Sequence, residues 1–347
     1  MPSATLRNRR TGRTRKRALV ACADVRRTPR FTGADMLTVL TIELAKGLPA
    51  VDSDAVMTSA DTVYASPTSL YVATNGGWER NDTSIHRFDL DGAARTVYRA
   101  SGQVPGDLLN QFSMSEYKDV LRVATTDSSG AKSQSLVTAL APRSGRLAKI
   151  GQVGGLGEGE RIYAVRFIED RGYVVTFRQI DPLFTLDLAD PTHPRVRGEL
   201  KIAGYSAYLH PVGPHRLLGV GQDATPLGRQ AGTQLSLFDV ADPVAPKLLS
   251  KVKLGHFTSS QAEYDHHAFL WWEPLRLAVI PVSGEEGTTE AAAFNVDHGT
   301  ITPAGSSHED GFVLRTLIVA GRLLTLSDHA LSVYDPATLR PGPVARF

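Results

Sequence analysis

The fold class is decided by the segment Leu235-Ser-Leu-Phe-Asp-Val-Ala-Asp-Pro243. A short apolar strand that ends in Phe-Asp leads into an Asp-Pro turn, where proline presets φ and the aspartate side chain can cap the turn. Similar strands recur throughout the chain, at residues 85–90, 136–140, 183–188, 292–296 and 331–335. The segment is therefore one copy of a repeated unit.

A second apolar strand, in its clearest form x-Val-Ala-Thr, precedes each of these strands. The middle residues of this second strand recur about every 50 residues, as expected for propeller repeats, at Val72, Val123, Val174, Leu218, Ala278 and Leu324. Each unit has room for four short strands, and residues 60–347 show no convincing helical periodicity. A four-stranded blade that is apolar on both faces must stack on its neighbours, so the pattern predicts an all-β protein, a β-propeller.

Six complete four-stranded blades fit between residue 60 and the end of the chain. Before them, residues 36–44 read as a third strand and residues 51–58 as a fourth strand. We therefore expect an N-terminal half-blade, a six- to seven-bladed propeller over residues 31–347, and a sequence that is truncated within a blade.

Charge separates the start of the chain from the rest. Residues 1–30 hold ten basic residues and one acid, whereas residues 31–347 hold 28 basic and 35 acidic residues, a net charge of −7. We expect a disordered basic segment over residues 1–30. The acidic body argues against a nucleic-acid partner.

Cys22 is the only cysteine, which excludes an intrachain disulfide and a cysteine-based zinc site. No apolar run is long enough for a transmembrane segment. The apolar stretch over residues 18–25 contains Asp24 and makes a poor signal peptide, so we expect no export signal in this sequence.

Several motifs in order resemble the secreted bacterial and archaeal proteins with a C-terminal β-propeller domain, and the strand-turn pattern is similar to LVIVD-type repeats. The motifs that carry the resemblance are Val63-Tyr-Ala-Ser-Pro-Thr-Ser-Leu-Tyr-Val-Ala-Thr74, Gly204-Tyr-Ser-Ala-Tyr-Leu-His-Pro-Val-Gly213, Leu218-Gly-Val-Gly-Gln-Asp223 and Asp265-His-His-Ala-Phe269. The resemblance implies an extracellular or cell-surface propeller and supplies no catalytic residues.

Candidate ligand-binding residues near the propeller axis come from two observations. Alignment of the units puts Arg166, His210 and Arg315 at similar depths on innermost strands, where guanidinium groups could bind an anion. Asp265 and His266 belong to an Asp-His-His run that we also place in an innermost strand. Because adjacent strand residues point to opposite faces, His266 and His267 cannot easily bind one ion, and we expect no metal site there. A site made by one of these histidines with distant partners stays open. Both groups can also be read as structural, pairing locally or lining a wet channel.

A second set of candidates lies in the long loops between second and third strands, which mark one face as the binding side. These loop-face candidates are Trp78, Arg80, Arg178, Asp181, Gln222 and Asp223. Ordinary variation in loop length is the alternative explanation.

The sequence carries no Gly-x-Ser-x-Gly, His-Glu-x-x-His or Walker A motif. We expect no cofactor and no catalytic residues, and we favour a non-enzymatic, extracytoplasmic binding or scaffold module for a protein or cell-surface component. Two alternatives stay open, a propeller hydrolase or lyase with a site in the axial channel and an inactive truncated fragment. The sequence does not indicate the ligand or the oligomeric state.

Overall fold

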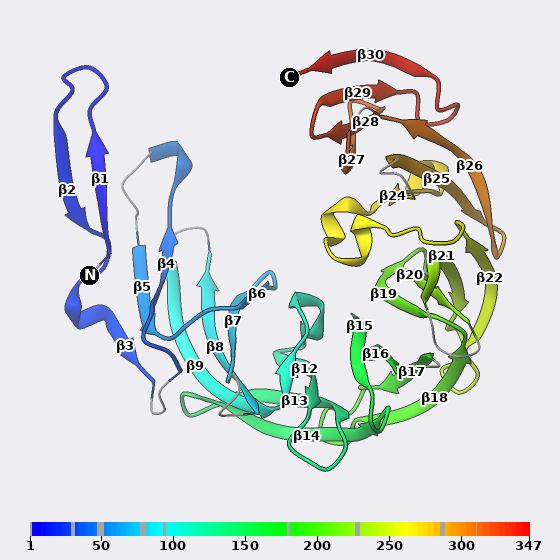
Figure 1. Ribbon diagram of the computed structural model, residues 1–347. Helices are drawn as coiled ribbons and strands as arrows, with labels where there is room; N and C mark the ends of the chain where they lie inside the picture. The colour runs from blue at the N-terminus through cyan, green and yellow to red at the C-terminus, as the bar shows by residue number, and fades with distance from the viewer. Residues whose placement is uncertain are drawn as a thin grey trace. The chain divides into compact units, whose positions relative to one another are not determined.

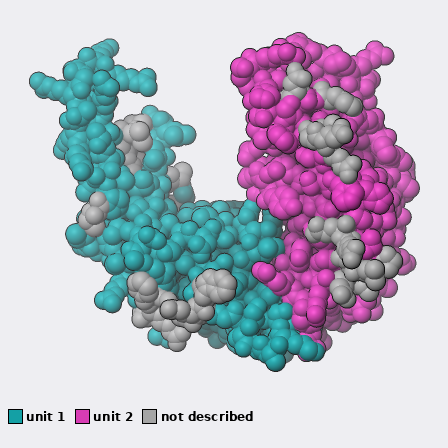
Figure 2. All heavy atoms as spheres, in the orientation of Figure 1, with its two compact units in different colours: residues 1–155, 190–194 teal, residues 156–189, 195–347 magenta. Residues whose placement is uncertain are grey.

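The computed structural model describes residues 2–28, 32–46, 52–76, 81–92, 95–178, 181–225, 230–284, 289–309 and 311–347. In this part of the chain the structure is all-β, with a few 3₁₀ turns and no α-helix (Figure 1). None of its helices is long and apolar enough to cross a membrane. The chain divides into two compact units, which Figure 2 colours separately: residues 1–155 with 190–194, and residues 156–189 with 195–347.

The first unit begins with a hairpin and a small sheet. β1 (Ser3–Arg7) pairs with β2 (Thr14–Ala18), and β5 (Asp52–Met57) lies between β3 (Val25–Arg27) and β4 (Met36–Thr41). The antiparallel β4–β5 pair confirms the two strands predicted there. The hairpin differs from the disordered segment expected over residues 1–30, because Thr5, Leu6 and Arg7 find backbone partners across a turn that the Asn8 side chain caps.

A nine-stranded sheet completes the first unit. A single parallel pair, Arg146 with Ser101, joins two antiparallel runs. Tyr71, Ile85, Met114, Leu121 and Leu140 are fully buried in its core. Its strands are β6 (Thr62–Ala65), β7 (Ser69–Asn75), β8 (Asp82–Asp91), β9 (Arg95–Pro105), β10 (Asp107–Leu108), β11 (Met114–Tyr117), β12 (Val120–Asp127), β13 (Gln134–Arg143) and β14 (Arg146–Leu156).

The second unit consists of four sheets, each built from four antiparallel strands in chain order, as expected for propeller blades. The first two sheets are β15 (Arg161–Ile168), β16 (Arg171–Phe177), β17 (Asp181–Asp187), β18 (Arg195–Ile202), and β19 (Tyr205–Pro211), β20 (Arg216–Ala224), β21 (Gln230–Asp239), β22 (Lys247–Lys253). The last two are β23 (Leu270–Trp272), β24 (Leu277–Ser283), β25 (Thr289–Asp297), β26 (Thr300–His308), and β27 (Val313–Val319), β28 (Arg322–Ser327), β29 (Ala330–Tyr334), β30 (Pro341–Arg346).

The Asp-Pro turn that suggested the fold links β21 to β22 and packs against the preceding sheet of the second unit. Asp242 Oδ1 accepts a hydrogen bond from the Val244 amide at 2.9 Å, as an aspartate-capped turn requires. The turn packs on Gly198 of β18, where an added Cβ would lie 2.5 Å from the Pro243 carbonyl oxygen. Thr185 Oγ1 donates to the same oxygen. A glycine in the fourth strand therefore makes room for the turn of the following sheet.

Candidate functional site

The innermost strands of the second unit carry the three predicted axial residues. Arg166 lies in β15, His210 in β19 and Arg315 in β27. The segment between β22 and β23 adds Asp265, His266 and His267, and the Tyr208 ring contacts both Arg166 and Phe269. We call the following seven residues the inner cluster: Arg166, Tyr208, His210, Asp265, His266, His267 and Arg315.

Arg166 links the first two sheets of this unit. Its Nε and Nη2 donate to the Leu209 carbonyl oxygen at 2.8 and 2.6 Å, and its guanidinium lies 5.3 Å from the centre of the Tyr208 ring. Burial lowers the pKa of Arg166, although the Tyr208 hydroxyl opposes the shift. The guanidinium keeps its positive charge, because arginine does not lose its proton in proteins.

His210 packs against two aromatic side chains, those of Tyr208 and Phe269. Its Nδ1 lies 3.0 Å from the Tyr208 hydroxyl, and its ring centre lies 4.8 Å from that of Phe269. Burial, helped by the charge of Arg166, lowers the pKa of His210 to about 4. The imidazole is therefore neutral at physiological pH.

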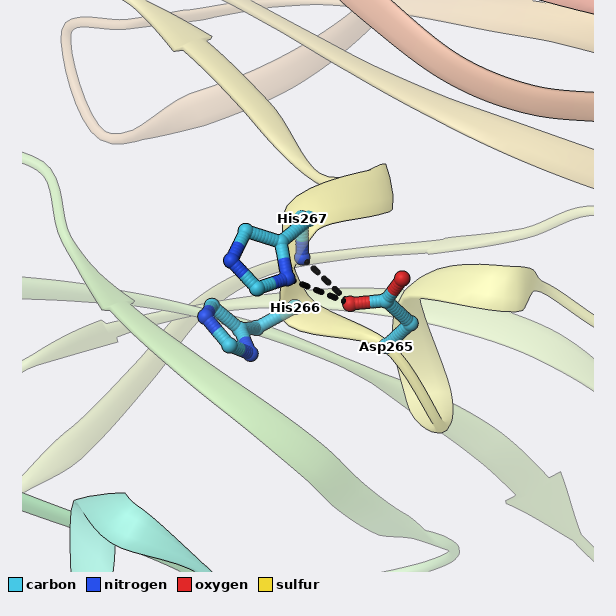
Figure 3. A group of neighbouring side chains, drawn as sticks. All are labelled: Asp265, His266 and His267. Carbon is cyan, nitrogen blue, oxygen red and sulfur yellow. Dashed lines mark hydrogen bonds and ion pairs between the residues drawn. The ribbon is translucent and has the colours of Figure 1, made fainter. Parts of the chain in front are cut away.

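The Asp-His-His run does not lie in a strand, so that prediction is wrong. His266 begins a 3₁₀ turn, η5 (His266–Ala268), and β23 starts only at Leu270. Asp265 caps the turn by accepting from the His267 backbone amide at 2.9 Å and from its Nδ1 at 2.8 Å. The tight turn brings consecutive side chains together where a strand would separate them. Figure 3 shows the two imidazole rings side by side. Their centres are 3.9 Å apart.

The segment that carries this turn is fixed to the sheets. Ser259 and Ser283 exchange two backbone hydrogen bonds of 2.9 and 2.8 Å. In the adjacent 3₁₀ turn, η4 (Gln261–Glu263), Ser260 and Glu263 form a capping box, and Glu263 Oε1 accepts from Gln222 Nε2 at 2.7 Å. Burial raises the pKa of Glu263, which these hydrogen bonds oppose.

Positive charge predominates in the inner cluster. Arg315 Nη2 lies 3.6 Å from Asp265 Oδ2. Burial lowers the pKa of His266, and His267, Arg166 and Arg315 add to the shift against the opposing effect of Asp265. The charges of both guanidinium groups thus disfavour protonation of this imidazole. Among the side chains that the structure describes in the cluster, two arginines and three histidines accompany one carboxylate, which contacts His267 and Arg315.

The loop-face candidates do not form a common site in the described residues. Trp78 and Arg80 lie outside those residues, Arg178 is exposed just after β16, and Asp181 is the first residue of β17. Gln222 and Asp223 were predicted in a loop, but both are buried near the end of β20, because β20 and β21 stay paired as far as Ala224 and Gln230. Asp223 contacts the ammonium groups of Lys251 at 2.9 Å and Lys253 at 2.6 Å.

Sequence reasoning missed two members of the site, Tyr208 and His267. Tyr208 lies two residues before His210, a spacing that puts both side chains on one face of a strand. That spacing could have identified Tyr208 as a neighbour of His210. Asp265 and His266 were predicted as candidates without His267, and the structure pairs Asp265 with His267 and with Arg315.

The family to which the sequence is matched agrees with the repeated four-stranded sheets. A model of the β-propeller domain family matches residues 1–339. The chain belongs to this β-propeller domain family. The match begins at residue 1 and includes the segment that the sequence set apart as basic.

Two archaeal proteins are similar in sequence to this β-propeller domain. An uncharacterised protein of Methanocaldococcus jannaschii is 37% identical over 259 residues, covering 74% of this chain and 39% of the relative. An uncharacterised protein of Archaeoglobus fulgidus is 41% identical over 257 residues, covering 74% of this chain and 38% of the relative. The chain thus spans about two fifths of the length of these relatives.

Solved propeller structures resemble the chain in fold. The periplasmic gluconolactonase of Pseudomonas aeruginosa superposes with a TM-score of 0.56 at 13% identity, covering 83% of this chain and 85% of that one. A putative 6-phosphogluconolactonase from Bacteroides uniformis gives 0.51 at 12% identity, covering 85% and 89%. At these identities the similarity establishes the fold alone.

Proposed function

We propose that this β-propeller domain is a non-enzymatic binding module whose inner cluster recognises a carboxylate-rich segment of a partner protein. The observation that carries the proposal is the excess of cations, with Arg166 and Arg315 both acting on His266 while Asp265 is the one carboxylate of the cluster. Arginine offers a planar array of donors that matches a carboxylate.

The surroundings of these cations favour such a ligand. Arg166 is held by the Leu209 carbonyl and the Tyr208 ring, so its position is set before a ligand arrives. Arg315 keeps 47% of its side chain exposed and its carboxylate partner is 3.6 Å away, a contact that a second carboxylate can rival. The cluster can therefore accept an anion without losing a strong internal ion pair.

We place this module outside the cytoplasm and in a propeller of six to seven blades. The resemblance to secreted propeller proteins supports the location, and the repeat spacing supports the blade number. Partner binding through a face of the propeller agrees with the use of rigid repeat scaffolds as binding surfaces.

A fluorescein-labelled hexaglutamate peptide tests the proposal by fluorescence anisotropy at low ionic strength. We expect saturable binding that weakens with salt, and a loss of about tenfold in affinity for Arg315→Gln, the equivalent of one charge-assisted hydrogen bond. Arg195→Gln, at an exposed position of β18, is the matched control and should bind like the wild type. Equal affinity for hexaglutamine, or no effect of Arg315→Gln, would refute the proposal.

A propeller hydrolase is the second candidate, because Asp265 and His267 form a carboxylate–imidazole pair. The 2.8 Å contact from Nδ1 to Oδ1 orients the ring, and His267 is 56% exposed. In a lactone hydrolase His267 would take a proton from water as it attacks the carbonyl carbon, the ring C–O bond would break, and the proton would pass to the leaving oxygen. The two lactonases of similar fold suggest the substrate class.

Glucono-δ-lactone is the probe for this candidate. The hydrolase predicts turnover above the spontaneous rate that falls at least tenfold in Asp265→Asn. Wild-type protein that leaves the spontaneous rate unchanged would eliminate the hydrolase and would not affect the binding proposal.

A further inference from the structure

Three metal-ligating side chains meet at the turn η5. Asp265, His266 and His267 each offer one ligand atom, and these atoms all lie within 4.8 Å of one another. Figure 3 shows the Asp265 carboxylate directed at the His267 ring, with the His266 ring beside it. The strand geometry that argued against chelation by neighbouring histidines is absent here, because the residues form a 3₁₀ turn.

The spacing of these donors suits one ion. Ligand atoms held about 2.0–2.1 Å from a zinc ion lie about 3.3 Å apart. Asp265 Oδ1 and His267 Nδ1 are 2.8 Å apart, so the ion would take the place of the proton between them, and the ligand atom of His266 lies within 4.8 Å of both. His267 is 56% and Asp265 33% exposed, so an ion can enter from solvent.

The donor types select the ion. Calcium and magnesium require six or more oxygen ligands, whereas two imidazole nitrogens and one carboxylate oxygen suit zinc and its neighbours. We propose that Asp265, His266 and His267 form a binding site for a divalent transition-metal ion such as Zn²⁺, with water completing the coordination. The site shares Asp265, His266 and His267 with the inner cluster. The ion is held without any peptide, so metal binding and peptide binding can be tested separately.

The nearby guanidinium groups set the strength of this site. Arg315 Nη2 lies 3.6 Å from the Asp265 carboxylate, and both Arg315 and Arg166 act electrostatically on His266. Positive charge beside the ligands opposes a cation, so binding is weaker than in a zinc site without arginine. Removing the Arg315 charge should therefore tighten metal binding.

Calorimetry with ZnCl₂ on tag-free, chelator-stripped protein tests the site. We expect one Zn²⁺ per chain, and a visible absorption band when Co²⁺ is added in equal amount to the wild type. His266→Ala and His267→Ala should each lower the affinity at least tenfold. The absence of both Zn²⁺ heat and the Co²⁺ band in the wild type would overturn the inference without relying on any variant.

His193 provides the matched control. It pairs with Asp190 through Nδ1 and Oδ2 at 2.9 Å, as His267 pairs with Asp265, and the Asp190 turn supplies one imidazole only. We expect His193→Ala to leave Zn²⁺ binding unchanged. Unchanged binding in the His266→Ala/His267→Ala double variant, or loss in His193→Ala, would place the ion elsewhere and overturn the inference.

Arg315→Gln separates this inference from the proposed function, because the two predict opposite effects. Zn²⁺ should bind several-fold more tightly to the variant, whereas hexaglutamate should bind more weakly. Zn²⁺ binding without peptide binding refutes the proposed function alone, and peptide binding without Zn²⁺ binding refutes the metal site alone.

Discussion

The guanidinium group of Arg166 donates from both Nε and Nη2 to one acceptor, the carbonyl oxygen of Leu209. The donor lies in β15 and the acceptor in β19, so a single side chain joins the innermost strands of two sheets. A residue that suggests ligand binding by its charge also has a structural role.

Arg166→Met should lower the free energy of unfolding by about 1–3 kcal/mol, because the Leu209 carbonyl loses its charged donors. Urea denaturation followed by fluorescence measures the change. Arg195→Met, at an exposed position of β18, should stay within about 0.5 kcal/mol of the wild type. Similar costs for the two variants would contradict the assigned role of Arg166.

Stability should fall as the pH is lowered from 6.5 towards 4, because the pKa of His210 is about 4 in the folded protein and 6.5 without burial. In this range the unfolded chain binds a proton that folded His210 does not, which costs roughly 2–3 kcal/mol of stability at the acid end. His210→Phe should retain its stability better than the wild type as the pH falls.

Urea titrations at successive pH values measure this difference. The matched control is His298→Asn, since the His298 side chain is 90% exposed. Parallel stability curves for the wild type and His210→Phe would show that His210 does not titrate as predicted.

Gly198→Ala should destabilise the second unit by about 1–3 kcal/mol, as overpacking does in a close contact. The new methyl group would meet the carbonyl oxygens of Pro243 and Val244 at 2.5 and 2.8 Å. Gly130→Ala is the control, because the nearest atom to its added Cβ is 3.4 Å away. A melting temperature for Gly198→Ala equal to that of the control would contradict the contact.

Asp223→Ala should cost about 1–3 kcal/mol, because it leaves the half-buried ammonium group of Lys251 without its carboxylate. Although burial opposes it, Lys253 and Lys251 lower the pKa of Asp223, so this contribution is present at neutral pH and is lost only as the pH falls below 4. Glu199→Ala removes the exposed pair with Lys201 and should have a much smaller effect. Equal denaturation midpoints for the two variants would contradict this role of Asp223.

The repeated strands and the inner positions could be predicted because their signals are local. The Asp242-Pro243 turn carries its own chemistry, and the apolar strands before it fix the register that brings Arg166, His210 and Arg315 to innermost strands. Any residue at the same place in each repeat falls on the same strand. That part of the site follows from periodicity alone.

The rest depended on hydrogen bonds that periodicity does not encode. Asp265 caps its own turn and so removes the strand alternation expected for His266 and His267. Gln222 is drawn into a buried network by Glu263, which is 41 residues away in sequence. Such contacts depend on the folded positions of distant segments, which single-sequence patterns cannot supply.

The two hydrogen bonds between Ser259 and Ser283 close residues 259–283 into a loop whose ends are fixed to each other. The Asp265 turn lies inside that loop, so its ordering is complete when the protein folds. An ion or carboxylate that binds there meets side chains on a fixed backbone, and little conformational entropy is left to lose on association. Opening this loop, for example with Ser259→Pro, which removes a backbone N–H donor, should therefore weaken binding at the turn although every ligand atom is kept.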